Sequence, residues 1–119
     1  MTRRTERVGE EIRAQIARVL REEATDPRLR LVTLTRVDVA PDFARADVYW
    51  SVIEREHGVA REQTEQALEH AAGFLRRRLA EALTLRRMPS LHFHYDPSLA
   101  LGSETLALLR DLRHDDGER

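Results

Sequence analysis

The sequence of 119 residues contains no cysteine and no lysine. Without cysteine, neither a disulfide framework nor thiol-based catalysis is available. The longest stretch free of Asp, Glu and Arg is eight residues, Met88 to Tyr95, whereas a membrane-spanning helix needs about 20 mostly apolar residues. We therefore predict a soluble, cytoplasmic protein, long enough to bury one hydrophobic core without covalent or metal cross-links.

Glycine and serine motifs of known chemistry are also missing. The five glycines, at positions 9, 58, 73, 102 and 117, form neither a phosphate-binding Walker loop nor a dinucleotide fingerprint. No serine lies in a Gly-x-Ser-x-Gly nucleophile elbow. The sequence therefore gives no support to nucleophilic catalysis or nucleotide hydrolysis, and it indicates no catalytic residue and no cofactor.

The spacing of apolar residues predicts the order of the secondary-structure elements. Apolar residues three or four positions apart are typical of an amphipathic helix, and alternation of apolar and polar residues is typical of a half-buried strand. The expected elements are, in chain order, a helix over residues 5–23, strands over 31–39 and 44–52, a long helix through 68–83, a strand over 91–95 and a helical segment through 106–112. We expect Thr5 to cap the first helix, and the alternation slips near Arg36, as a β-bulge would allow.

These elements predict a two-layer α+β sandwich, because the helices can bury their apolar stripes only against the apolar face of the sheet. The order is α-β-β-α-β followed by a C-terminal helical segment. Gly73 lies inside the long helix, where a glycine costs about 1 kcal/mol relative to alanine and allows a bend or a close backbone approach. We expect a kink there, in a single domain over residues 1–113 with a polar tail at 114–119.

Positive charge is concentrated in two parts of a chain whose net charge is only −1. All twenty basic residues are arginine, whose planar guanidinium suits phosphate groups. The candidate nucleic-acid-binding residues are Arg76, Arg77, Arg78, Arg86 and Arg87, with Arg3, Arg4, Arg7, Arg28 and Arg30 as a weaker group. The first group, opposed only by Glu81, predicts an anion-binding patch that contacts phosphates without reading sequence. It equally fits a solvated helix face with cations near its C-terminus, and both interpretations stay open.

One constellation has the ligand types of a metal site. His92, His94 and Asp96 occupy alternate positions along and just after the last predicted strand, so their side chains point the same way. Polar residues at alternate positions are also what the solvent side of a strand carries, and no fourth ligand is indicated. We therefore predict no metal site.

The sequence resembles the bacterial ribosome-binding factor A family over nearly its whole length. Each matching piece is weak alone, but the pieces occur together, in order and at matching spacings. They are Arg7-Val8, Asp26-Pro27-Arg28, Val32 to Val37, Ala46 to Tyr49, Ala71 to Arg76, and the block from Leu85 to Ser98 with Gly102 after it. The resemblance implies a type II KH-like fold in which an Ala-x-Gly kink, here Ala71, Ala72 and Gly73, replaces the Gly-x-x-Gly loop of ordinary KH domains.

The resemblance also implies a function. Such a factor binds the small (30S) ribosomal subunit without catalysing a reaction, assists late maturation and 5'-end processing of 16S ribosomal RNA, and leaves before translation. It implies a monomer that binds the free subunit transiently, with a link to cold adaptation and no membrane partner. Alternatives are a general single-strand RNA-binding module, a metal-dependent enzyme built on His92, His94 and Asp96, and a protein-interaction adaptor that uses the acidic stretch 54–73.

Overall fold

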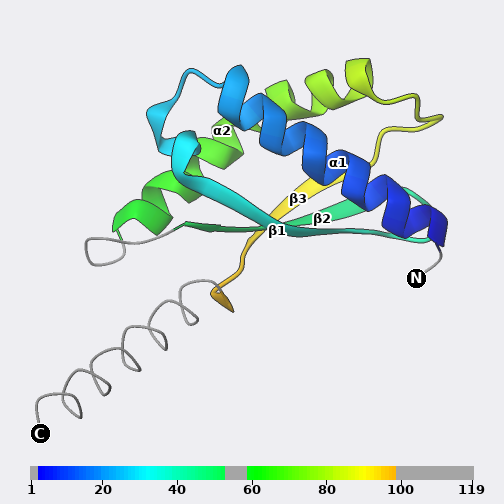
Figure 1. Cartoon of the computed structure of the whole chain (residues 1–119), viewed down its shortest axis with the longest axis horizontal. Coiled ribbons are helices and arrows are strands. Elements are labelled where there is room, and N and C mark those ends of the chain that lie inside the picture. Colours follow the sequence, from blue (N-terminus) through cyan, green and yellow to red (C-terminus); the bar gives the residue numbers. More distant parts are fainter. Residues whose placement is uncertain (1–2, 53–58, 99–119) are drawn as a thin grey trace, which may run out of the picture.

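The fold is a three-stranded sheet with two long helices on one of its faces (Figure 1). A computed structural model describes residues 3–52 and 59–98, so the predicted C-terminal helical segment and polar tail lie outside the described residues. The elements are α1 (Arg3–Glu22), the 3-10 helix η1 (Pro27–Leu31), β1 (Val32–Val39), β2 (Arg45–Val52), α2 (Val59–Ala82) and β3 (Ser90–Tyr95). This order confirms the predicted α-β-β-α-β architecture. Neither long helix in this part of the chain is apolar enough to cross a membrane.

The central strand of the sheet is β2, which pairs antiparallel with β1 and parallel with β3. Parallel neighbours need a crossover connection, and α2 supplies it. The register between β1 and β2 shifts between Leu34 and Arg36, which confirms the predicted slip. The predicted apolar face of β2 is also confirmed, because Ala46, Val48 and Trp50 are at most 1% exposed.

The core lies between this face of the sheet and the two helices. α1 packs on β1, whereas α2 packs on β2 and β3. Each helix contributes one apolar stripe, represented by Ile12 and Ile16 in α1 and by Leu68 and Leu75 in α2, all of them fully buried. Burial of each such side chain contributes about 1.5–3 kcal/mol. Packing on the sheet therefore fixes where the polar sides of the helices face.

α1 comes unusually close to β1 at Gly9. A Cβ atom added to this buried glycine would lie 2.6 Å from the carbonyl oxygen of Val37, which is closer than Cβ atoms approach in real proteins. The neighbour is backbone of a paired strand and cannot rotate away. Only glycine therefore permits this helix-to-strand distance.

The beginning of α1 differs from the expectation. The described helix already includes Arg3, so Thr5 is its third residue and the prediction that Thr5 caps the helix is wrong. The Thr5 side chain is buried, on the same side as Val8 and Ile12. Thr5 therefore belongs to the core-facing stripe of α1. A short polar residue can occupy such a position, so a threonine near the start of a helix is not always a cap.

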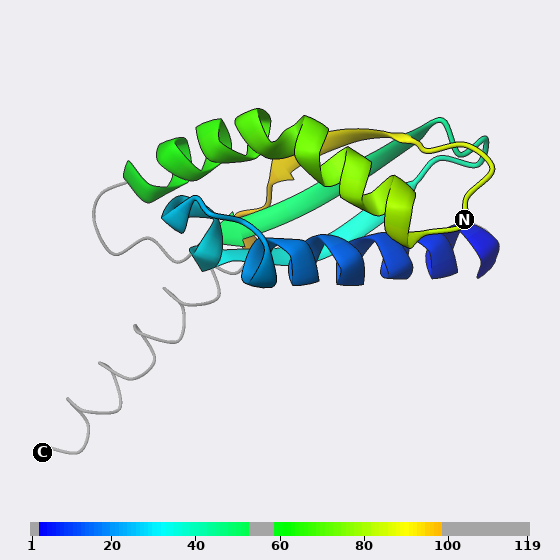
Figure 2. The same cartoon turned by 90° about the horizontal axis from the view of Figure 1, so that it is seen from above.

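α2 is one continuous helix of 24 residues, and its axis changes direction near its middle (Figure 2). Gly73 is exposed, and an added Cβ would meet only the end of the Arg77 side chain, at 3.8 Å. Within the described ranges, close approach of another backbone therefore does not explain this glycine. That Ala71, Ala72 and Gly73 produce the bend stays a prediction.

We expect the substitution Gly73→Ala to raise the free energy of unfolding by up to about 1 kcal/mol, because alanine restricts the unfolded chain and has space at this position. Urea denaturation followed by circular dichroism measures the change. A lower free energy of unfolding in the variant would show that the bend of α2 needs a conformation that only glycine adopts well.

Candidate nucleic-acid interface

A group of exposed arginines lies on one flank of the fold. Arg76 and Arg77 of α2, together with Gly73, Ala80 and Met88, line a hollow of about 420 Å³. Met88 belongs to the connection that leads from α2 into β3. Because β3 is the edge strand farthest from β1, this hollow lies on the β3 flank.

The connection from α2 to β3 adds two more guanidinium groups. Arg86 and Arg87 precede Met88 directly, and both are exposed. Arg76, Arg77, Arg86 and Arg87, here called the α2 arginine cluster, form no ion pair with any residue that the structure describes. Arg76 and Arg77 line the hollow, and Arg86 and Arg87 directly precede Met88, which also lines it. Four uncompensated guanidinium groups in this part of the chain make a local site for anions, and the repeated phosphates of nucleic acid suit it.

Arg78 differs from its neighbours in sequence. It turns toward the core side of α2, is only partly exposed, and pairs with Glu23, which follows α1, and with Glu81 at 2.6 Å. Hydrogen bonding to Glu23 raises the pKa of Arg78 further above its usual range. These contacts give Arg78 a structural role, tying the end of α1 to α2, and its predicted contact with RNA stays a prediction.

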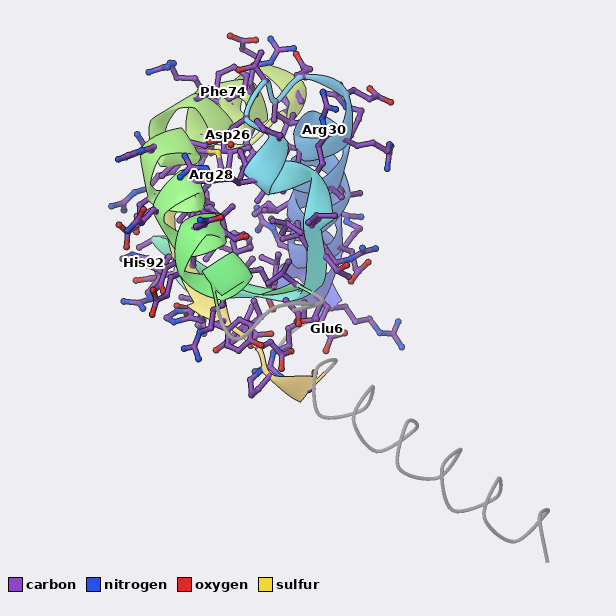
Figure 3. The ribbon with its side chains drawn as sticks, turned by 90° about the vertical axis from the view of Figure 1, so that its left-hand side faces the viewer. Glu6, Asp26, Arg28, Arg30, Phe74 and His92 are labelled. Carbon is purple, nitrogen blue, oxygen red and sulfur yellow. The ribbon has the colours of Figure 1, made fainter. Side chains whose placement is uncertain are left out.

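Arg28 is partly exposed but also has an ionic partner within the protein. Its guanidinium donates to both carboxylate oxygens of Asp26, with the shortest N···O distance at 2.6 Å, and Figure 3 labels the two residues side by side at the start of η1. Asp26 caps η1 by accepting from the backbone N–H of Arg28. The hydrogen bonds from Arg28 lower the pKa of Asp26. The pair explains why these two residue types flank Pro27.

The N-terminal arginines lie at the end of the molecule where α2 runs into β3 (Figures 1 and 2). Arg3 and Arg7 are exposed and form no ion pair within the described residues. The guanidinium of Arg4 lies over the ring of Phe43, 5.1 Å from its centroid. Phe43 belongs to the turn between β1 and β2, so only Arg3 and Arg7 of this group are available to a ligand without losing an internal contact.

Arg30 lies on the opposite flank, beside α1 and β1 (Figure 3). It is exposed and shares a second hollow with Arg13 and Arg21 of α1, which the sequence analysis did not single out. The signal was present, because residues eight positions apart on a helix lie on the same side. The arginines nominated from the sequence therefore do not form one surface.

The three side chains considered as metal ligands have separate partners on the uncovered face of the sheet. His92 lies 3.0 Å from the Ser90 hydroxyl, His94 lies 2.7 Å from Asp47, and Asp96 accepts from the Thr35 hydroxyl at 2.6 Å. Among the described residues, no three His, Asp or Glu side chains are grouped so that they could hold a metal ion. This arrangement gives no support to a metal-dependent enzyme.

Asp96 connects the end of β3 to β1 across the central strand. Hydrogen bonds from the Thr35 hydroxyl and from the backbone N–H of Ser98, at 2.9 Å, lower the pKa of Asp96 below its usual 3.8. Because the folded state depresses this pKa, the contribution of Asp96 to stability is complete above about pH 4 and is lost as the pH falls through the folded-state pKa.

We therefore expect Asp96→Asn to lower the thermal midpoint at pH 7 by roughly 3 °C. The difference from the unaltered chain should shrink as the pH falls below about 4. Thermal melts across a pH series measure it, with Glu69→Gln, at an exposed position of α2, as the control. A difference that stays constant with pH would contradict the role given to the Asp96 carboxylate.

The architecture defines the chain as a KH-like α+β domain, with two helices on one face of a three-stranded mixed sheet and no Gly-x-x-Gly sequence. A family model described as ribosome-binding factor A matches residues 4–109. The chain belongs to the ribosome-binding factor A family.

Individual relatives agree with this assignment. The chain is 40% identical over 115 residues to ribosome-binding factor A of Pseudomonas syringae pv. syringae, covering 97% of this chain and 83% of the relative. It is 42% identical over 114 residues to ribosome-binding factor A of a Marinomonas species, covering 95% and 88%.

Solved structures show the same fold. The crystal structure of ribosome-binding factor A from Thermus thermophilus has a TM-score of 0.65 at 27% identity and covers 76% of this chain and 93% of its own. Coordinates of a Thermus thermophilus ribosome binding factor A homology model, fitted into a cryo-electron microscopy map of a 30S complex, have a TM-score of 0.51 at 33% identity and cover 73% and 93%.

Proposed function

We propose that this chain binds the small ribosomal subunit by placing the α2 arginine cluster against phosphates of its 16S ribosomal RNA. The observation that carries the proposal is the difference among the arginines. The four members of the cluster are exposed and lack an ionic partner in the described ranges, whereas Arg28 and Arg78 hold internal carboxylates. The Thermus thermophilus relative placed in a 30S complex supports the choice of subunit.

The proposed role is assembly without catalysis. A factor that binds one RNA arrangement better than another shifts the RNA toward that arrangement by the difference in binding free energy. We propose that this shift assists late maturation of the subunit and 5'-end processing of its RNA, in the cytoplasm and as part of adaptation to cold. The protein acts as a monomer that binds the free subunit transiently, and the bend at Ala71 to Gly73 sets the direction in which the cluster faces.

The N-terminal arginines have an assisting role in this proposal. The beginning of α1, which carries Arg3 and Arg7, lies at the same end of the molecule as the connection from α2 to β3, which carries Arg86 and Arg87 (Figures 1 and 2). The N-terminal arginines can therefore reach neighbouring phosphates. Contacts of this kind are spread over a surface and add to affinity without specifying sequence. Arg4, Arg28 and Arg78 support the surface through their internal contacts.

Co-sedimentation with isolated small and large subunits, over a salt series from about 50 to about 300 mM, tests the proposal. We expect binding to the small subunit alone, with an affinity that falls steeply as the salt concentration rises. The reason is that binding releases counterions from the RNA, and this release is less favourable at high salt. Short single-stranded RNA should compete poorly. Equal binding to both subunits, or to short RNA as tightly as to the subunit, would favour a general RNA-binding module instead.

A further inference from the structure

A second basic hollow lies between α1, η1 and the beginning of β1. It has a volume of about 270 Å³, and three arginines border it, Arg13 and Arg21 from α1 and Arg30 from η1. Its floor includes Leu20 and Leu29, each 3% exposed. The floor is therefore part of the core, and Ala17, Val32 and Leu34 also line the hollow, so a ligand that enters it meets both guanidinium groups and apolar side chains.

The three guanidinium groups are available to different degrees. Arg30 is exposed and has no ion-pair partner within the described residues. The Arg21 side chain is 69% exposed and lies 3.7 Å from Glu22, whereas Arg13 is held by Glu10 at 3.0 Å. Exposed ion pairs of this kind contribute at most about 1 kcal/mol, so a phosphate can replace either carboxylate. Arg21 and Arg30 carry most of the attraction for an anion.

The spacing of these groups favours a polymer of phosphates. Arg13 and Arg21 are eight residues apart on α1, a distance of about 12 Å along the helix axis. A nucleic-acid backbone presents phosphates repeatedly along its length, so it can contact guanidinium groups that are spread over such a distance. An acidic protein segment would also match the charge, but every backbone unit of a nucleic acid carries a negative charge, which gives the denser match to three guanidinium groups. The chemistry therefore favours RNA.

The second hollow and the α2 arginine cluster lie on opposite flanks. α1 packs on β1 and α2 packs on β3, and β2 separates these two edge strands. The view in Figure 2 shows the two helices along opposite edges of the sheet, on the same face. One RNA helix that lies along one flank therefore leaves the other flank accessible.

We propose that Arg21 and Arg30, assisted by Arg13, bind a second RNA segment, so that one molecule bridges two segments of RNA. The proposal rests on the function proposed above, because the first segment is bound by the α2 arginine cluster. Once one flank is occupied, binding at the other becomes intramolecular for segments of the same RNA, and its effective concentration is high. Bridging gives the factor a direct means to favour RNA arrangements that bring two helices together.

The test uses the full chain and two RNA duplexes of about 16 base pairs, one carrying a donor dye and the other an acceptor. We compare the unaltered chain with Arg21→Gln/Arg30→Gln and with Arg76→Gln/Arg77→Gln. The control, Arg36→Gln/Arg61→Gln, removes the same charge from arginines that contact Tyr49 and Tyr95. Fluorescence anisotropy reports binding of one duplex, energy transfer reports bridging, and mass photometry reports stoichiometry.

We expect energy transfer from a complex of one protein and two duplexes, and the control should retain it. Each of the other two variants should still bind one duplex, while its energy transfer falls at least about fivefold. Unchanged transfer in Arg21→Gln/Arg30→Gln, or transfer only from complexes of two proteins, would overturn the bridging proposal and leave the proposed function intact.

Two further outcomes are separable. Poly-L-glutamate that binds the unaltered chain but not Arg21→Gln/Arg30→Gln, with no second duplex bound, would assign the hollow to an acidic protein segment and overturn the proposal. If the unaltered chain binds neither the duplexes nor the small subunit, both the proposed function and the bridging proposal are rejected.

Discussion

Substituting glutamine at all four positions of the α2 arginine cluster is expected to lower the affinity for the small ribosomal subunit about a thousandfold at low salt. Each lost charge-assisted contact is expected to cost about 1 kcal/mol of binding free energy. Four such losses cost about 4 kcal/mol, which corresponds to about a thousandfold lower affinity. The slope of log affinity against log salt should also become shallower by about 3, since each phosphate contact contributes about 0.7–0.9 to it.

The matched control removes four charges from arginines that have internal partners. Its substitutions are Arg18→Gln, Arg36→Gln, Arg45→Gln and Arg61→Gln. Because these residues contact protein groups, we expect less than about a threefold change in affinity. Similar losses in both variants would mean that total charge, rather than the position of the cluster, determines binding.

Gly9→Ala is expected to lower the free energy of unfolding by about 2 kcal/mol. The added methyl group would meet the Val37 carbonyl oxygen at 2.6 Å, and overpacking against backbone costs about 3 kcal/mol, of which about 1 kcal/mol is offset by the better helix propensity of alanine. For a domain of this size the thermal midpoint should fall by roughly 10 °C.

Thermal and urea denaturation measure this change, and Gly73→Ala is the control with the opposite expected sign. The two substitutions are chemically identical and both lie in helices, but only Gly9 faces a strand backbone. Stabilisation by Gly9→Ala would contradict the close contact between α1 and β1.

The element order was predictable because it depends on local periodicity. The alternation of Ala46, Val48 and Trp50 marked the buried face of the central strand, and the slip near Arg36 marked the bulge. The close approach at Gly9 was not predictable, since it depends on how far α1 lies from a strand whose residues are 28 positions away. Periodicity indicates which side of a helix is buried but not the distance to its neighbour.

The candidate site was predictable only in part. Residues 76–78 form one run of three arginines, and the helix period places Arg76 and Arg78 at similar angles on either side of the buried stripe, so it does not predict which of the two has a partner. The partner of Arg78 is Glu23, 55 positions earlier, and the contact exists only because α1 and α2 pack together. Long-range ion pairs of this kind decide which arginines are left for a ligand. Arg13 and Arg21 likewise lie next to Arg30 only in the folded chain, because tertiary packing places α1 beside η1.

Arginine footprinting on the complex tests the central claim most directly. Phenylglyoxal modification of the chain, alone and bound to the small subunit, followed by mass spectrometry, measures the reactivity of each guanidinium. We expect Arg76, Arg77, Arg86 and Arg87 to be reactive in the free protein and strongly protected in the complex, with Arg36 and Arg45 unchanged. Equal reactivity of the α2 arginine cluster in both states, with the protein demonstrably bound, would contradict its role as the surface that contacts ribosomal RNA.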